Sequence, residues 1–325
     1  MQLDRALLKL PIRFDAEALE TEVRALPKSA WAPHPTGFVG NEAVRLITPH
    51  GKDNDEFNGP MGPTGHLLAC PYIMHIMDEM GCVWGRSRLM GLGAGADVPK
   101  HVDTHYYWRT HWRIHIPVIT NPAVTFTCGE ETVHMAAGEC WVFDSFRWHT
   151  VRNGGAEQRI HLVLDAVGGG RLRELVEAGQ RGVAEPQFVA PGRPAVTDLA
   201  FERVNAPDVM SPWELRAHFA FLADRAVPHP LLGAVLKRLE DFVDDWAAVW
   251  AQFEASEEGW PEYLEMLESL KADLSSLGGG DVLLKNRFKL YSVLDHMVLL
   301  NLFGDPAAVA AKAEAVAGVR HKLAS

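Results

Sequence analysis

The sequence predicts an α+β protein in which an antiparallel, double-sheet β core is joined to a helical C-terminal region. Between about residues 86 and 170, short period-two segments alternate with Gly- and Asn-containing turns, and no helical pattern separates them. Beyond about residue 195 this pattern stops, and apolar residues recur with helical spacing. Many short strands joined by tight turns indicate an antiparallel barrel or a double-sheet jelly roll.

The strands of the core are predicted at residues 86–92, 108–120, 124–128, 132–135, 140–143 and 159–165. Before them, residues 15–26 have helical spacing, and residues 48–64 form a loop long enough to suggest a function. We therefore predict a catalytic domain over residues 1–195, with its β core at about 86–170, and a helical accessory domain over residues 196–325.

The accessory domain begins with a clear helix start. Ser211 is suited to the N-cap, Pro212 to the first helical position, and Glu214 to closing a capping box. Helical spacing then continues over residues 232–253, 261–277 and 282–302, and an Ala-rich helix closes the chain. The Trp-rich stripe of residues 232–253 indicates a helical core or a homodimer interface rather than a cofactor site.

Composition narrows the class of protein. A hydrophobic fraction of 47% with 22% charged residues is typical of a folded globular chain. The net charge of -11 argues against nucleic-acid binding, which needs a clustered basic surface. We find no signal peptide and no apolar run that could span a membrane, so we expect a cytoplasmic protein without a membrane partner. The four cysteines are widely spaced without a CxxC pair, which favours buried free thiols.

Two histidines, one aspartate and one arginine carry the chemistry. In an extended chain His101 and Asp103 point to the same side, although such a triplet alone is a weak signal. His149 precedes a turn at residues 153–155, and Arg159 begins the returning strand. If the loop comprises those three residues, His149 and Arg159 face each other across a hairpin. Two histidines and one carboxylate make the facial triad that leaves positions open on iron(II).

Arg159 and a neighbouring strand suggest where a co-substrate lies. 2-Oxoglutarate, after chelating the metal, needs a permanently charged bidentate partner for its remote carboxylate, and Arg159 is of that type. In the strand that follows residue 108, the odd positions Arg109, His111, Arg113 and His115 are polar and the even positions largely apolar. That polar face is either a solvated exterior or the lining of the active site. In the second case Arg113 and His115 meet the carboxylates of 2-oxoglutarate or of the substrate.

Four segments between residues 86 and 169 carry a family resemblance: RLMGLGAGADVPKHVD, WRIHIPV, GECWVFDSFRWHTVRN and RIHLVLD. In this order and spacing they resemble the aspartyl/asparaginyl β-hydroxylase family, which also includes bacterial proline hydroxylases. The resemblance implies a double-stranded β-helix (cupin-like) core, Fe(2+) ligands at His101, Asp103 and His149, 2-oxoglutarate binding by Arg159, and O2 as co-substrate. Animal peptidyl-aspartyl enzymes lack the carboxylate ligand, so Asp103 places this sequence nearer to the bacterial members with a full triad.

The predicted reaction is hydroxylation of an unactivated C–H bond. The substrate is expected to carry a carboxylate, as a small-molecule amino acid or as an aspartyl/asparaginyl-type residue in a peptide or carrier-bound molecule. Candidate substrate residues are Arg88, Trp108, Asn41 and Arg45. Asn41 and Arg45 belong to a polar, aromatic N-terminal stretch that is either a surface loop or a cover for the substrate, and the 48–64 loop is a candidate for closure.

Other interpretations stay open. A cupin-type metal-dependent hydrolase or isomerase would use the same ligands without 2-oxoglutarate, and a non-catalytic cupin-core protein would only bind. His101 and Asp103 also fit a surface pair, His149 a buried structural histidine and Arg159 a structural ion pair. His105, one period-two step beyond Asp103, is a competing ligand.

Overall fold

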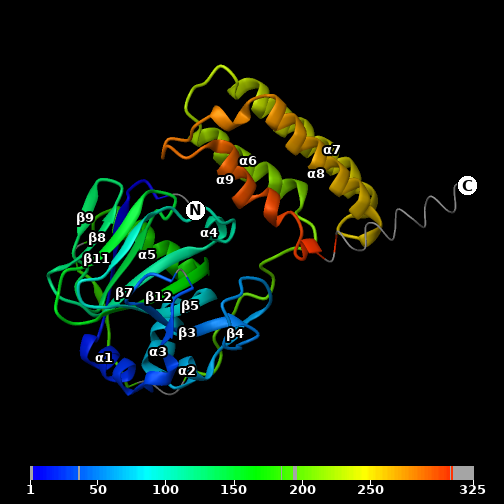
Figure 1. The fold of residues 1–325 in the computed structure, drawn as a ribbon. Coiled ribbons are helices and arrows are strands. Elements are labelled where there is room, and N and C mark those ends of the chain that lie inside the picture. Colours follow the sequence, from blue (N-terminus) through cyan, green and yellow to red (C-terminus); the bar gives the residue numbers. More distant parts are fainter. Residues whose placement is uncertain (1–2, 36, 184, 193–195, 308, 310–325) are drawn as a thin grey trace, which may run out of the picture. The chain divides into compact units, whose positions relative to one another are not determined.

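The computed structural model describes residues 3–35, 37–183, 185–192, 196–307 and 309 (Figure 1). The chain divides into two units. The first comprises Met1–Asp103 and Tyr107–Asn205, and the second comprises Thr104–Tyr106 and Ala206–Ser325. The predicted domain limit at residue 195 falls on residues outside the described part of the chain and stays a prediction. The predicted fold class is confirmed, because the first unit has a cupin-like β core with helices and the second is helical.

Two facing sheets make the core of the first unit. The larger sheet contains β1 (Leu7–Phe14), β2 (Ala32–Pro33), β3 (Asn41–Pro49), β4 (Met61–Pro63), β5 (Val83–Leu92), β7 (Trp112–Ile119), β10 (Glu139–Phe143), β12 (Arg159–Gly168) and β13 (Gln187–Val189). The smaller sheet contains β6 (Asp97–His101), β8 (Val124–Cys128), β9 (Glu131–Val133) and β11 (His149–Asn153). The strand orders are β13-β1-β10-β7-β12-β5-β3-β2, with β4 paired to β3, and β6-β11-β8-β9.

Helices cover the outer face of the larger sheet (Figure 1). The helices of this unit are α1 (Ala16–Ala25), α2 (Gly65–Leu68), α3 (Pro71–Met80), α4 (Tyr107–Thr110) and α5 (Gly170–Gln180). Buried side chains of α1, α3 and α5 form one apolar core with Ile114 and Ile116 of β7. Because side chains alternate along a strand, Arg113 and His115 of β7 point the other way, toward the smaller sheet.

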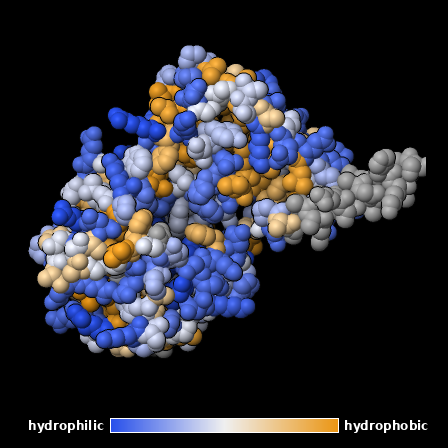
Figure 2. Space-filling view, in the orientation of Figure 1, coloured by the Kyte–Doolittle hydropathy of each residue, from blue (hydrophilic) through white to orange (hydrophobic). Residues whose placement is uncertain are grey.

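The second unit contains α6 (Pro212–Arg225), α7 (Leu232–Phe253), α8 (Trp260–Ser276) and α9 (Leu290–Met297). The predicted cap is present, since the Ser211 hydroxyl accepts a hydrogen bond from the Glu214 amide at 3.3 Å. Trp246 of the Trp-rich stripe is fully buried, whereas Trp213 is 71% exposed. Figure 2 shows further apolar side chains on the surface of this unit. A homodimer through these helices stays a prediction.

Three expectations about elements need correction. The strand predicted at 108–120 begins only at Trp112, because residues 107–110 form α4. The helix predicted over 282–302 is shorter, with α9 covering Leu290–Met297. His149 and Arg159 do not face each other in one hairpin, because β11 pairs with β6 and β8 whereas β12 pairs with β5 and β7. The turn between them carries the chain from one sheet to the other.

Several smaller expectations can be compared with the structure. The helix predicted at 15–26 is α1, and the Asp15 side chain caps it by accepting from the Ala18 amide at 3.0 Å. All four cysteines are buried and free. Most of the predicted Ala-rich terminal helix lies outside the described residues. Among the described helices, none is long and apolar enough to cross a bilayer.

Candidate metal centre and co-substrate pocket

Strand pairing in the smaller sheet brings the two predicted histidine ligands together. His101 ends β6 and His149 begins β11, and the antiparallel register places them directly opposite each other. Their ring centroids lie 4.1 Å apart. Asp103 follows two residues after His101, and its backbone amide donates to the Ser145 carbonyl at 3.0 Å. This bond fixes the segment that carries the carboxylate beside the two rings.

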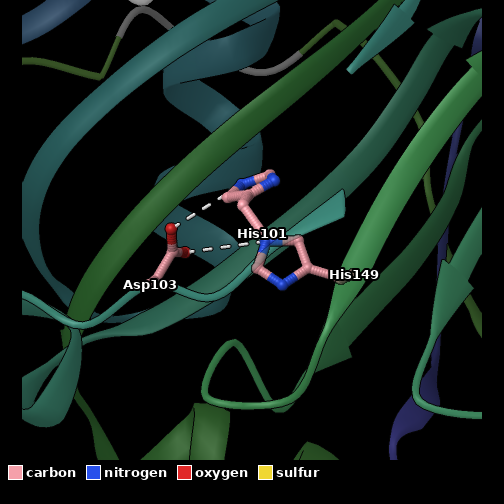
Figure 3. A group of neighbouring side chains, drawn as sticks. All are labelled: His101, Asp103 and His149. Atoms are coloured by element: carbon pink, nitrogen blue, oxygen red, sulfur yellow. Dashed lines mark ion pairs between the residues drawn. The ribbon is translucent and has the colours of Figure 1, made fainter. Parts of the chain in front are cut away.

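The donor atoms of these three side chains converge (Figure 3). One Asp103 oxygen lies 3.9 Å from His101 Nε2, and the other lies 4.0 Å from His149 Nε2. All three donor atoms lie within 4.8 Å of one another, close enough for one metal ion. His105 is not a member of this group in the described part of the chain.

Each imidazole is oriented by its other ring nitrogen. His101 Nδ1 lies 2.8 Å from the Pro99 carbonyl and His149 Nδ1 lies 2.9 Å from the Arg147 carbonyl. A carbonyl oxygen only accepts, so both Nδ1 atoms act as donors, and both Nε2 atoms face Asp103. Burial lowers the pKa of His149 to about 4, which keeps that ring neutral. Two imidazoles and a carboxylate are the donor set that suits iron(II).

Arg113 orients the carboxylate of this group. Its Nη1 donates to Asp103 at 3.2 Å, while Nε and Nη2 grip Asp165 at 3.1 and 3.3 Å. Its guanidinium also lies 3.7 Å from the centroid of the Trp108 ring. Arg113 is therefore hydrogen-bonded to two carboxylates, one of which is Asp103. Its predicted contact with the co-substrate stays a prediction.

A cavity of about 480 Å³ lies between the two sheets and contains the three converging side chains. Its volume is within the range of small-molecule sites. Every residue that lines it belongs to the first unit. Among the predicted site residues, those that line it are His101, Asp103, His149, Arg159, Arg113, His115, Arg88, Trp108 and Asn41. Arg45 does not line it.

Arg159 is a buried cation in this cavity, and the described residues supply no counter-charge for it. It is 4% exposed, and its Nε and Nη2 atoms have no hydrogen-bond partner among the described residues. Burial lowers its pKa to about 9. Nearby, His115 and His161 have pKa values held well below the ordinary histidine value, by burial first and then by the charge of Arg159. The Nε2 atoms of both rings also lack a partner within the described residues.

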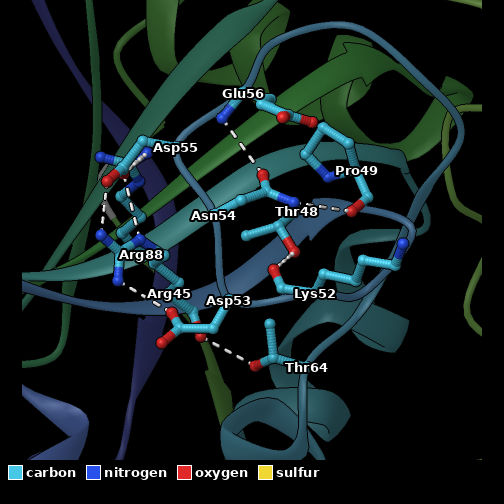
Figure 4. A network of polar contacts seen from close by, with 10 residues as sticks. All are labelled: Arg45, Thr48, Pro49, Lys52, Asp53, Asn54, Asp55, Glu56, Thr64 and Arg88. Atoms are coloured by element: carbon cyan, nitrogen blue, oxygen red, sulfur yellow. Dashed lines mark hydrogen bonds and ion pairs between the residues drawn. The ribbon is translucent and has the colours of Figure 1, made fainter.

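Another part of the cavity wall is cationic, and carboxylates of the 48–64 loop balance part of its charge (Figure 4). Arg88 donates to Asp55 at 2.6 Å, and Arg86 donates to the Asp55 carbonyl at 3.1 Å. Arg45 binds Asp55 through two nitrogens and Asp53 through the third at 2.8 Å. Burial lowers the pKa of Arg86 to about 10. The loop therefore reaches the site, as its length suggested.

Sequence reasoning missed several residues of this site. Asp165 and His161 share the inward face of β12 with Arg159, and period-two spacing from Arg159 was the signal that could have found them. Arg86 is likewise two residues from Arg88. Asp55 offered no such signal, because its place in the cavity depends on the path of a loop. His111, on the predicted polar face, is buried against Glu202 at 3.1 Å and does not line the cavity.

Comparison with known proteins agrees with the resemblance of the β core. Residues 63–168 match the family model described as aspartyl/asparaginyl beta-hydroxylase. The predicted resemblance is confirmed for this segment. It spans about a third of the 325 residues and includes the three converging side chains and Arg159. No curated protein matches the sequence.

Three solved structures with a similar β core are an oxygenase-family protein, a prolyl-4-hydroxylase and a cupin domain. An oxidoreductase of the 2OG-Fe(II) oxygenase family from Burkholderia pseudomallei is 16% identical, covering 51% of this chain and 87% of its own, with a TM-score of 0.37. A prolyl-4-hydroxylase from Pseudomonas putida is 13% identical, covering 50% and 92%, with a TM-score of 0.35. A cupin domain from Schizosaccharomyces pombe is 11% identical, covering 49% and 77%, with a TM-score of 0.27. At these scores the likenesses add nothing to the functional argument.

Proposed function

We propose that the protein is an iron(II)- and 2-oxoglutarate-dependent oxygenase that hydroxylates an unactivated C–H bond. The observation that carries the proposal is the buried guanidinium of Arg159, which no carboxylate of the described residues neutralises, in the cavity that also holds His101, Asp103 and His149. A buried charge without a partner is costly, and an anion that binds there removes the cost. A dicarboxylate held at the metal by one end and at Arg159 by the other meets this need.

Different side chains bind the metal, position its carboxylate ligand and bind the co-substrate. His101 and His149 offer Nε2 atoms to the metal, and Arg113 holds the Asp103 carboxylate in place as the third ligand. Arg159 binds the remote carboxylate of 2-oxoglutarate, with the neutral His115 beside it. Iron(II), when bound with 2-oxoglutarate and O2, supplies the oxidant for the C–H bond. The apolar part of the wall, including Phe126 and Phe143, keeps water away from this chemistry.

We assign the Arg86 and Arg88 side of the cavity to the substrate. Arg88 binds the Asp55 carboxylate, whereas Arg86 donates only to the Asp55 backbone carbonyl, so a positive charge is left over. A substrate carboxylate fits this charge, as carried by an amino acid or by an aspartyl/asparaginyl-type residue of a peptide or carrier-bound molecule. Trp108 and Asn41 line the same cavity and would contact the substrate.

The test is an anaerobic titration with iron(II) and 2-oxoglutarate, followed by absorption spectroscopy. We expect the charge-transfer band of the iron(II)–2-oxoglutarate chelate in the native protein and its loss in His149→Ala. Arg159→Gln should keep iron(II) binding but require much more 2-oxoglutarate. A native protein that binds iron(II) but shows no band would be a hydrolase or isomerase of the cupin type. One that binds no iron(II) would be a binding protein without this chemistry.

Turnover provides the second part of this test. Succinate release from 2-oxoglutarate would be measured under air for a panel of amino acids and of aspartyl and asparaginyl peptides. A carboxylate-bearing compound should stimulate succinate formation, and its amide should not. Equal stimulation by acid and amide would contradict the assignment of Arg86 and Arg88 to a substrate carboxylate.

A further inference from the structure

Asp55 places one of the chain's own carboxylates on the substrate side of the cavity. Its Oδ1 accepts from Arg88 Nη2 at 2.6 Å and from Arg45 Nε at 3.1 Å, and its Oδ2 accepts a second bond from Arg45 (Figure 4). Its side chain is 31% exposed and lines the cavity. Burial acts to raise the pKa of Asp55, but the bonds from Arg45 and the charge of Arg88 outweigh it and hold the pKa below its ordinary value.

The two arginines that bind Asp55 are not equivalent. Arg45 has a second carboxylate, Asp53, at 2.8 Å, and it lies outside the cavity lining. Arg88 lines the cavity, and Asp55 is the acceptor found for it within the described part of the chain. Losing Asp55 therefore leaves Arg45 paired, whereas it leaves Arg88 as a buried cation that faces the cavity.

The same short segment also covers the neighbouring arginine. The Phe57 ring centroid lies 3.7 Å from the Arg86 guanidinium carbon, and the Asp55 carbonyl accepts from Arg86 Nη2 at 3.1 Å. Arg86 Nε is buried without a partner among the described residues. Asp55 and Phe57 thus lie against the two guanidinium groups, and of this pair only Asp55 brings a negative charge. The geometry is that of an anion subsite in which the anion comes from the protein itself.

The structure assigns to Asp55 the position that a substrate carboxylate takes on Arg88, so we propose that an anionic substrate binds by displacing the Asp55 side chain. This inference rests on the proposed function only in taking the incoming anion to be the substrate. A molecule without a carboxylate cannot replace the negative charge that Asp55 supplies to Arg88. Asp55 thereby makes entry into the substrate side depend on negative charge, which gives this loop residue a role in specificity.

The test measures binding by calorimetry, with L-aspartate as the probe and L-asparagine amide as its counterpart without a carboxylate. 2-Oxoglutarate is present to fill the Arg159 side. Asp55→Asn removes the competing charge and should tighten L-aspartate binding by about tenfold or more, while binding of L-asparagine amide should not tighten. Asp53→Asn is the matched control, since it removes a charge from the same loop and from Arg45 but not from Arg88. It should bind like the native protein.

Two further readouts separate competition from a structural role. Asp55→Glu keeps the competing charge, so it should bind L-aspartate as weakly as the native protein does and more weakly than Asp55→Asn. Hydrogen exchange of residues 53–57 should speed up in the native protein on adding L-aspartate and not on adding L-asparagine amide. The proposal is overturned if Asp55→Asn binds L-aspartate no more tightly than the native protein, including the case in which no variant binds it. It is equally overturned if both probes tighten alike.

The outcome is distinguishable from that of the proposed function. The titration of 2-oxoglutarate reports on the function, whereas the ratio of L-aspartate affinities between Asp55→Asn and the native protein reports on Asp55. Neither measurement requires turnover.

Discussion

At the level of single residues, two arginines on the inner face of one sheet have opposite surroundings. Arg113 is held by Asp165 and Asp103, whereas Arg159 has no carboxylate partner among the described residues. A compensated buried charge stabilises the site around it, and an uncompensated one is a cost that a ligand can remove. The first is therefore suited to positioning, and the second to binding.

This contrast predicts stability changes of opposite sign. In the absence of 2-oxoglutarate, Arg159→Met should raise the free energy of unfolding by about 1–4 kcal/mol, because it removes a buried charge without a partner. Arg113→Met should lower it by about 3–5 kcal/mol, because Asp165 and Asp103 lose their counter-charge. Urea unfolding of both variants would measure this. A clear loss of stability in Arg159→Met would show that the guanidinium has a structural partner.

The buried histidines predict a pH dependence. Burial keeps the pKa of His161 and His115 well below the ordinary value, so both rings stay neutral in the folded chain. Below about pH 6.5 the unfolded chain binds protons that the folded chain does not, so stability falls as the pH falls. Each such ring contributes about 1.4 kcal/mol per pH unit.

Between pH 6 and 5, His161→Leu should reduce the slope of unfolding free energy against pH by about 1.4 kcal/mol per pH unit, which corresponds to about one proton. Urea unfolding at stepped pH gives the slope, and the range from pH 7 to 8 serves as the internal control because His161 binds no proton there. An unchanged slope would mean that this ring is already protonated in the folded chain.

At the level of elements, the pairing of β6 with β11 assembles the candidate metal centre. It places His101 opposite His149, and the Thr150 hydroxyl ties the two strands by donating to the Val98 carbonyl at 2.6 Å. The turn after β11 is fixed separately. The side-chain amide of Asn153 donates to the carbonyls of Leu92, Gly93 and Glu157 at 2.9, 3.0 and 2.8 Å. One fully buried side chain thus joins the end of β11 to the end of β5.

Replacing this amide should be among the most damaging single changes in the β core. Asn153→Asp puts a carboxylate against three carbonyl oxygens and should cost about 3 kcal/mol or more of unfolding free energy. Asn121→Asp is the control, because the bond found for the Asn121 side chain among the described residues is one it accepts, from the Ala123 amide at 3.0 Å, and a carboxylate can do the same. Equal stability of the two variants in urea would contradict the role given to Asn153.

At the level of the whole molecule, the candidate site belongs to one of the two units. All residues that line the cavity lie in the unit formed by Met1–Asp103 and Tyr107–Asn205. A ligand that binds only the folded site stabilises the part of the chain that contains it. We therefore expect any stabilisation by co-substrate to be confined to that unit.

Hydrogen exchange with and without manganese(II) and 2-oxoglutarate would measure this. Peptides from β5, β7 and β12 should exchange more slowly when both are added, by about a hundredfold at a ligand concentration of 100 times Kd. Peptides from α7 and α8 should not change and serve as the internal control. Slower exchange in α7 or α8 would show that the helical unit responds to the site.

The sequence by itself determined the type of fold and the identity of the three converging side chains. Period-two spacing predicts strands because alternate side chains share a face, and this holds wherever the strands pair. The same rule puts His101 and Asp103 on one side of an extended chain. Helix signals were equally local, as the cap at Ser211 and the stripe of α7 show. Family resemblance then supplied His149 and Arg159 as partners of that pair.

Only the tertiary structure decided which strands carry the site residues and which carboxylates neutralise its arginines. The hairpin expected between His149 and Arg159 is absent because their strands join different sheets, and the two residues line the same cavity instead. Whether an arginine is free or neutralised depends on carboxylates far away in the sequence. Asp165 is 52 residues from Arg113, and Asp55 is 33 from Arg88. Packing decides which charges are neutralised. Sequence periodicity, in contrast, relates only residues that lie close together within one strand or helix.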